Sequence, residues 1–258
     1  MGLYIGGTAF GGMMGRVGMG LLTEIASWQA ALGVLGILCL AAALGFRLLL
    51  PPSRNFVPQP LFDPRFHLGA WATHLRNPGL LRLYAIGFVL TGIFVTLFNY
   101  VTFRLSGPPY RLGQTAISMV FLTYALGMAS SSAAGALADH FGRRPLLVLG
   151  FFTMLAGVLL TLAGSLAAIV AGIAVVTTGF FVGHAVASGS VGRLAAGSKG
   201  HAASLYLLFY YLGSSITGSA GGWFWQHGGW TAVVALTGAL AVAGTLLAAM
   251  AAPARVSR

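Results

Sequence analysis

The stretch Gly135-Ala-Leu-Ala-Asp-His-Phe-Gly-Arg-Arg-Pro145 is a short polar segment between two long apolar runs. Asp139 is one of only three acidic residues in the chain, and Arg143 and Arg144 follow it closely. Gly142 lets the backbone turn, and the proline is typical of the first turn of a new helix. The stretch therefore predicts a tight, basic connection between two transmembrane helices, on the side where basic loops are retained. Asp139 can offset the arginines or lie near the amide end of the next helix.

The composition requires lipid as the main solvent. Hydrophobic residues make up 57% of the 258 residues and charged residues only 7%, and one soluble core cannot bury so much apolar surface. The basic residues separate the apolar runs instead of gathering on one surface, which argues against nucleic-acid binding. The single Cys39 excludes a disulfide framework, and no residues have the spacing of metal ligands or of a cofactor site.

Hydrophobic segments of about 20 residues predict an all-α membrane protein. Eight spans are expected, covering residues 2–23, 28–50, 80–103, 115–137, 145–164, 166–188, 202–223 and 230–252. The first span carries Gly7, Gly11 and Gly15 at four-residue spacing. This spacing predicts a smooth helix face against which another helix packs closely.

Residues 51–79 form the one long polar segment, and its prolines disfavour a continuous helix at its start. We expect a cytoplasmic linker between two domains, with a short interfacial helix over residues 67–76. A long catalytic loop is the alternative, but the segment lacks paired carboxylates and a nucleophile with its base.

The segment at 135–145 resembles the signature loop of the major facilitator superfamily of secondary transporters, whose pattern is roughly Gly-x-Leu-x-Asp-x-x-Gly-Arg-Arg/Lys. The match covers Gly135, Leu137, Asp139, Gly142, Arg143 and Arg144. It lies between two predicted spans, as the family requires; the alternative is any basic cytoplasmic hairpin of a membrane protein. The resemblance implies that Gly135, Asp139, Gly142, Arg143 and Arg144 act as a gate, with contacts that hold in one conformation and break in another.

The chain also repeats itself. A shift of 202 positions places Leu3-Tyr4 on Leu205-Tyr206, and places Gly11, Gly20 and Trp28 on Gly213, Gly222 and Trp230. Spans one and two then correspond to spans seven and eight, so the repeating unit is six helices, as in the two parallel halves of major facilitator transporters.

This alignment predicts the domain organisation. Residues 1–50 are expected to be the last two helices of an amino-terminal half, 80–252 a complete six-helix carboxy-terminal half, and 253–258 a cytoplasmic tail. The chain is then a partial fold of the family, lacking its first four helices. A truncated sequence, a misplaced start codon or a degraded gene would each account for this.

Basic residues predict the orientation. With both termini placed inside, only Arg104 and Arg111 lie outside, and Arg16 lies within a span. The remaining eleven of the 14 basic residues lie inside: Arg47, Arg54, Arg65, Arg76, Arg82, Arg143, Arg144, Arg193, Lys199, Arg255 and Arg258. This asymmetry predicts cytoplasmic termini, in a bacterial inner membrane.

Five polar side chains within the predicted spans are candidates for a substrate pathway, namely Arg16, Asn99, His184, Tyr210 and Tyr211. A charge such as Arg16 is costly in lipid unless it faces a cavity or a partner, although it could also snorkel to the surface. His184 could relay protons or could simply be hydrogen-bonded inside the bundle. Tyr210 and Tyr211 could contact a polar solute or could bond neighbouring helices.

The stretch Asn-Tyr-Val-Thr-Phe-Arg at 99–104 and the Gly-Ser-Ser run at 213–215 look closest to bacterial drug- or sugar-efflux permeases. The resemblance implies a monomeric transporter in the lipid bilayer that moves a small molecule outward by alternating access, coupled to protons. The candidate residues would tolerate sugars, organic anions or amphipathic drugs. Glu24, Asp63 and Asp139 lie at helix ends or in loops, so His184 or a residue of the missing helices would serve coupling.

Two other classes of function are compatible with parts of the sequence. A non-transporting membrane fragment, or a partner subunit of another permease, would share the composition and the spans. An intramembrane enzyme would need an acid pair, a metal cluster or a nucleophile with a base at membrane depth, and the sequence contains none.

Overall fold

The computed structural model describes residues 2–52, 63–195 and 197–250, and within them every regular element is helical. In chain order these are α1 (Gly2–Ile25), α2 (Trp28–Leu49), α3 (Pro64–Leu75), α4 (Pro78–Ser106), α5 (Gln114–Met119), the 3₁₀ helix η1 (Val120–Thr123), α6 (Tyr124–Phe141), α7 (Arg143–Leu160), α8 (Leu166–Leu194) and α9 (Lys199–Ala249). The expected all-α fold is confirmed. Arg54, Arg255, Arg258 and the predicted tail lie outside the described residues.

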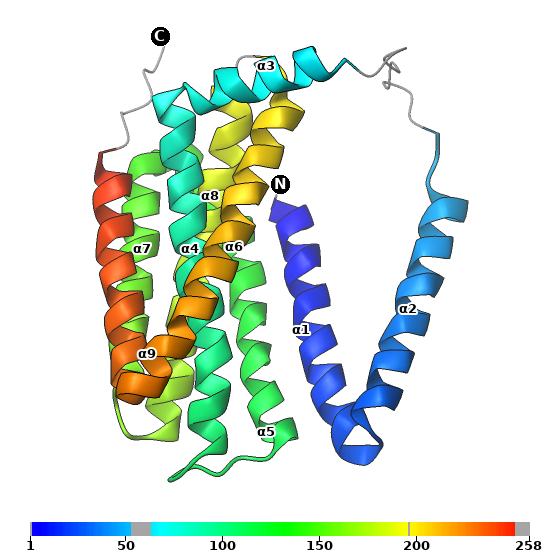
Figure 1. Cartoon of the computed structure of the whole chain (residues 1–258), viewed down its shortest axis with the longest axis vertical. Helices are drawn as coiled ribbons and strands as arrows, with labels where there is room; N and C mark the ends of the chain where they lie inside the picture. Colours follow the sequence, from blue (N-terminus) through cyan, green and yellow to red (C-terminus); the bar gives the residue numbers. More distant parts are fainter. Residues whose placement is uncertain (1, 53–62, 196, 251–258) are drawn as a thin grey trace.

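Six helical segments of the described part are long and apolar enough to cross a membrane: 28–49, 78–106, 114–141, 143–160, 166–194 and 199–249. The last of them holds two predicted spans, because α9 bends sharply at Gly229, where φ is +57° (Figure 1). The first predicted span is helical as α1, but it is not among the six, since its many glycines, Arg16 and Glu24 lower its hydropathy.

Helices α4 to α9 form one bundle with α4 at its centre, between α8 and the first arm of α9. Leu80, Tyr84, Leu90 and Leu97, spread along α4, are completely buried. Neighbouring helices therefore cover α4 along most of its length, which places it in the core.

Glycines bring α7 and α8 into close contact. A Cβ atom on Gly157 would lie 2.6 Å from the carbonyl oxygen of Gly172, and one on Gly179 would lie 2.6 Å from the carbonyl oxygen of Gly150. Gly150 and Gly157 lie seven residues apart on α7, as do Gly172 and Gly179 on α8. This is about two turns, so the two backbones meet along one face. This is the packing expected of glycine-rich helices in lipid.

The same expectation was wrong for the glycine face of α1. A Cβ on Gly7, Gly11 or Gly15 would meet no atom within 4 Å. Helix α1 packs instead on α5 and α6, and its closest approach is at Gly20, where a Cβ would lie 2.4 Å from the Ser118 side chain. Glycine spacing makes a face smooth, but it does not decide which face has a neighbour.

Helix α2 packs mainly on α1. Ala31 is its one buried residue, and large apolar side chains cover the rest of its surface, including Leu32, Ile37, Leu38, Leu40 and Leu44. Such a surface is typical of a helix that faces lipid.

A helix is present where the sequence predicts an interfacial one: α3 begins at Pro64 and lies across one end of the bundle (Figure 1). The Asp63 carboxylate caps it by accepting from the backbone N–H of Arg65. The rings of His67 and His201 meet with 2.8 Å between Nδ1 and Nε2, and Trp71 Nε1 donates to Ser204 Oγ at 3.3 Å. Part of the predicted linker is therefore packed against α9.

Candidate functional site

A cavity of about 360 Å³ lies between α1 and the bundle, with walls from α1, α4, η1, α6, α8 and α9. All five candidate residues of the sequence analysis line it: Arg16, Asn99, His184, Tyr210 and Tyr211. They come from four helices spread over nearly 200 positions of the chain, and folding brings them together. Their part in a substrate pathway stays a prediction.

Arg16 contributes the positive charge of this cavity. Its guanidinium lies 5.1 Å from the ring centroid of Phe121 and 5.8 Å from that of Tyr124, which is the range of cation–π contacts. Its Nη1 also donates to the carbonyl oxygen of Gly12 at 3.4 Å. Within the described residues its guanidinium has no carboxylate within ion-pair distance, because the ion pairs there all involve Asp139.

A second cavity of about 710 Å³ lies between α1, α2 and α5. Gly11 and Gly15 line it, so the smooth glycine face of α1 borders open space there. Gly12, Arg16 and Phe121 line both cavities. Arg16 therefore stands at the boundary between the two.

His184 is held by aromatic neighbours on one side of the first cavity. Its Nδ1 lies 3.0 Å from the hydroxyl oxygen of Tyr206. Its ring stacks parallel on Phe180 at 5.7 Å and lies 4.9 Å from the Tyr210 ring. The structure thus contains the hydrogen bond that the second interpretation of this residue expects, while a proton relay through it stays a prediction.

Most of the cavity wall is aromatic and could not be predicted from the sequence. Phe94 stacks on Phe180 at 4.0 Å and lies 5.4 Å from Tyr124, and Phe98, Phe121 and Phe181 complete an aromatic lining. Aromatic residues are so frequent in the apolar runs that nothing in the sequence separates these from the rest of the core. Only their position across three helices reveals the lining.

The segment at 135–145 forms a tight turn, as predicted. Helix α6 ends at Phe141, Gly142 adopts a φ of +88°, and α7 begins at Arg143. Positive φ is a conformation that glycine adopts without strain. Pro145 falls in the first turn of α7, where its missing N–H is not needed.

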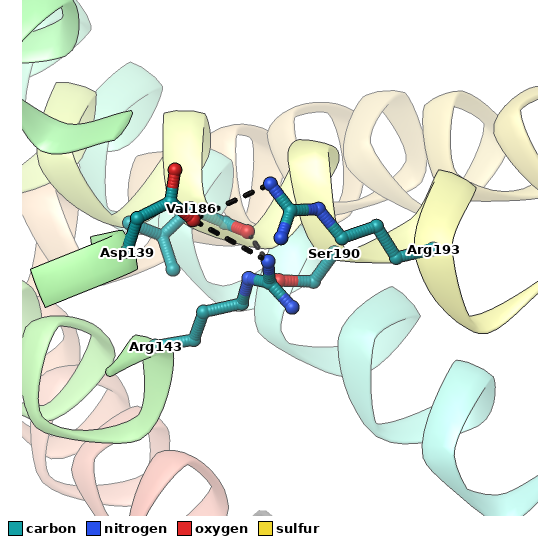
Figure 2. A network of polar contacts seen from close by, with 5 residues as sticks. All are labelled: Asp139, Arg143, Val186, Ser190 and Arg193. Atoms are coloured by element: carbon teal, nitrogen blue, oxygen red, sulfur yellow. Dashed lines mark hydrogen bonds and ion pairs between the residues drawn. The ribbon is translucent and has the colours of Figure 1, made fainter. Parts of the chain in front are cut away.

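Asp139 makes two ion pairs, one of which the sequence analysis did not expect. Its Oδ1 lies 3.8 Å from Nη2 of Arg143 and 3.4 Å from Nη2 of Arg193, and both arginines point toward it in Figure 2. Arg193 lies in the last turn of α8, which continues to Leu194 because Ser190 and Val191 are still packed in the bundle. Arg144 is exposed and forms no ion pair in the described structure. Asp139 thus offsets Arg143, as expected, and it also ties the turn to the end of α8 through Arg193.

The chain is similar in sequence to known membrane transport proteins. The sequence profile described as Major Facilitator Superfamily matches residues 108–258. The chain is 43% identical over 236 residues to the "Uncharacterized MFS-type transporter YybF" of Bacillus subtilis, covering 92% of this chain and 58% of that protein. It is 44% identical over 247 residues to the "Inner membrane transport protein YnfM" of Escherichia coli, covering 96% and 59%.

An "Uncharacterized transporter" of Buchnera aphidicola subsp. Schizaphis graminum is 39% identical over 233 residues, covering 90% of this chain and 56% of that protein. The chain therefore spans less than two thirds of the length of these relatives. All three names describe transporters and none describes an enzyme. With a profile match over more than half of its length, and with its apolar helices and signature turn, this multi-pass membrane chain belongs to the Major Facilitator Superfamily.

Proposed function

We propose that the chain carries the carboxy-terminal half, and the last two helices of the amino-terminal half, of a secondary active transporter. The transporter moves a small molecule, a drug or a sugar-sized solute, out of the cell by alternating access. The observation that carries the proposal is the convergence of all five polar candidate residues on one cavity between α1 and the bundle. Polar groups at membrane depth are retained where they face a pathway.

The ion pairs of Asp139 fit a gate. They connect the α6–α7 turn to the end of α8, and the Asp139 side chain is 62% exposed. Exposed ion pairs contribute only about 0–1 kcal/mol each. Contacts this weak can form in one conformation and break in the other at little cost.

Proton coupling is part of the proposal. None of the three acidic side chains of the sequence lines the cavity, so within this chain His184 is the group that could bind a proton there. The basic residues orient the transporter in a bacterial inner membrane with both termini in the cytoplasm.

The test is a transport assay in proteoliposomes with an imposed proton gradient. The chain is assayed alone and as a fusion to the part of YnfM that it does not cover, against a panel of sugars, organic anions and amphipathic drugs. We expect at least one compound to be moved, and its movement to collapse when a protonophore is added. Transport that a protonophore leaves unchanged would rule out proton coupling.

Failure of both proteins to move any compound, with both correctly folded, would contradict the transport proposal. It would favour the other candidate, a membrane fragment or partner subunit that transports nothing itself. The exposed apolar surface of α2 is the feature that such a partner would cover.

A further inference from the structure

The acidic side chains of this chain leave Arg16 without a counter-ion. The whole sequence contains three of them. Glu24 accepts a hydrogen bond from Thr115 Oγ1, and it lies eight residues beyond Arg16, roughly 12 Å along the helix. Asp63 caps α3, and Asp139 pairs with two arginines at the end of α8. The charge that the cavity presents is therefore positive and unneutralised.

The guanidinium of Arg16 is also under-used as a hydrogen-bond donor. Arginine carries five N–H groups, and in the described structure one nitrogen makes a long bond to the Gly12 carbonyl. The rings of Phe121 and Tyr124 stabilise the cation without accepting its N–H groups in the way an oxygen does. The remaining donors form a fork that suits a planar, two-oxygen anion such as a carboxylate.

The rest of the wall suits an aromatic or otherwise flat apolar body. Phe94 and Phe180 stack at 4.0 Å, and Phe98, Phe181 and Tyr210 line the same space. Tyr211, whose side chain lies at the cavity, is 63% exposed. Polar side chains also line the cavity, among them Asn99, His184 and Ser214, so the charge of Arg16, and not a lack of polar partners, favours an anion over a neutral sugar. The volume of about 360 Å³ is at the small end of ligand pockets, which hold roughly 300–1,000 Å³.

From these three observations we propose that the solute is an organic anion with an aromatic body, and that Arg16 binds its anionic group. This inference rests on the proposed function, and it selects one of the substrate classes that the sequence leaves open. The anion would bind between α1 and the bundle, with its ring against Phe94 and Phe180. Because Arg16 borders both cavities, the same side chain can meet the anion from either of them.

Binding to the purified chain in phosphatidylcholine nanodiscs tests the inference, since this lipid carries no net negative charge. Three probes of similar shape are compared: 2-naphthoate, the neutral 2-naphthamide and the cationic 2-naphthylmethylamine. We expect naphthoate to bind about tenfold or more tightly than the other two, because a hydrogen bond to a charged group is worth that factor. Equal binding of the three probes would overturn the inference.

Substitutions of single arginines test whether Arg16 is the charge that binds the anion. R16Q is expected to lose about tenfold or more in naphthoate affinity, and R16K to lose less. R47Q removes the same charge from the last turn of α2, outside both cavities, and should bind naphthoate like the parent chain. Undiminished binding by R16Q would contradict the assignment. If R16Q fails to fold, as judged by helix content and elution volume, the three-probe comparison on the parent chain still decides.

The two proposals fail separately. Naphthoate binding that needs Arg16, without flux in any proteoliposome, would leave the anion site standing and would sink the transport proposal. Flux of a neutral or cationic solute that R16Q leaves unchanged would sink the anion site and would leave transport standing.

Discussion

Arg104 connects three helices at the end of the bundle opposite α3. Its Nη1 donates to the carbonyl oxygen of Thr161, and its Nη2 donates to that of Ala163 at 3.2 Å. Its guanidinium also lies 5.0 Å from the Trp230 ring, whose Nε1 donates to the same Thr161 carbonyl at 3.2 Å. The last carbonyls of a helix such as α7 have no partner within it. Arg104 supplies that partner and brings the α9 bend to it.

We predict that R104Q lowers the free energy of unfolding by about 1.5–3 kcal/mol, because hydrogen bonds from a charged donor to partly buried carbonyls are lost. Unfolding of the purified chain in detergent measures this. R111Q is the matched control, since Arg111 is exposed in the adjoining loop. An equal effect of the two substitutions would refute this role of Arg104.

Asp139 is shared by two arginines, so substitutions of Asp139 and Arg193 should not have additive effects on transport. Because D139N removes both ion pairs, adding R193Q to it should reduce transport by the fusion protein no further. Separate effects would instead add, as they do for independent sites. Folded yield should change little in D139N, in R193Q and in the double variant, since exposed ion pairs are worth under about 1 kcal/mol. Additive losses in the double variant would show that the two side chains act separately.

At the residue scale, the sequence could single out polar side chains that share one cavity, but not which side chains would pair. Arg16, Asn99 and His184 stand out because they interrupt apolar runs, and they do line one cavity. Arg193 lies 54 positions from Asp139, and its pairing depends on how α8 packs. No local pattern contains that information.

The helices α7 and α8 depend on glycine at their contact. We predict that G157A destabilises the bundle by about 1–3 kcal/mol, since overpacking forces backbones apart and the new Cβ would lie 2.6 Å from the Gly172 carbonyl oxygen. G36A on α2 is the control, because a Cβ there meets nothing within 4 Å. Thermal unfolding in detergent compares the two, and a loss of stability as large in G36A as in G157A would contradict the account.

The docking of α3 gives another prediction at this scale. H201A removes the ring that His67 and Trp71 contact, so backbone amides of α3 should exchange with deuterium faster, while those of α4 stay protected. H140A replaces an exposed histidine at the end of α6 and serves as the control. Unchanged exchange in α3 of H201A would show that this contact does not hold the helix.

Helix positions followed from hydropathy, whereas helix neighbours did not. Residues 67–76 have the composition of an interfacial helix, and α3 covers most of them. The glycine spacing of α1 predicts close helix packing there, but the structure shows such packing between α7 and α8 instead. Partner choice depends on the complementary face of a second helix, which one helix's sequence does not describe.

Over the whole molecule, the internal repeat corresponds to two helical pairs. Trp28 is the first residue of α2, and Trp230 directly follows the Gly229 bend of α9, so both begin the second helix of a pair. Their surroundings differ, because Trp28 is 60% exposed and Trp230 only 9%. The arms of α9 pack on α4 and α7, while α2 packs mainly on α1. The repeat could be read from the sequence, but the unequal packing could not.

Side-specific labelling of the cavity tests the central claim, alternating access through the space between α1 and the bundle, most directly. Cys39 is replaced by alanine, and Ser214, which lines the cavity, is replaced by cysteine. A thiol reagent that does not cross membranes is then added to one side or the other of oriented vesicles. The account predicts fast labelling from one side only, and a change of side when D139N breaks the ion pairs of the turn. Equal labelling from both sides that D139N does not alter would contradict it.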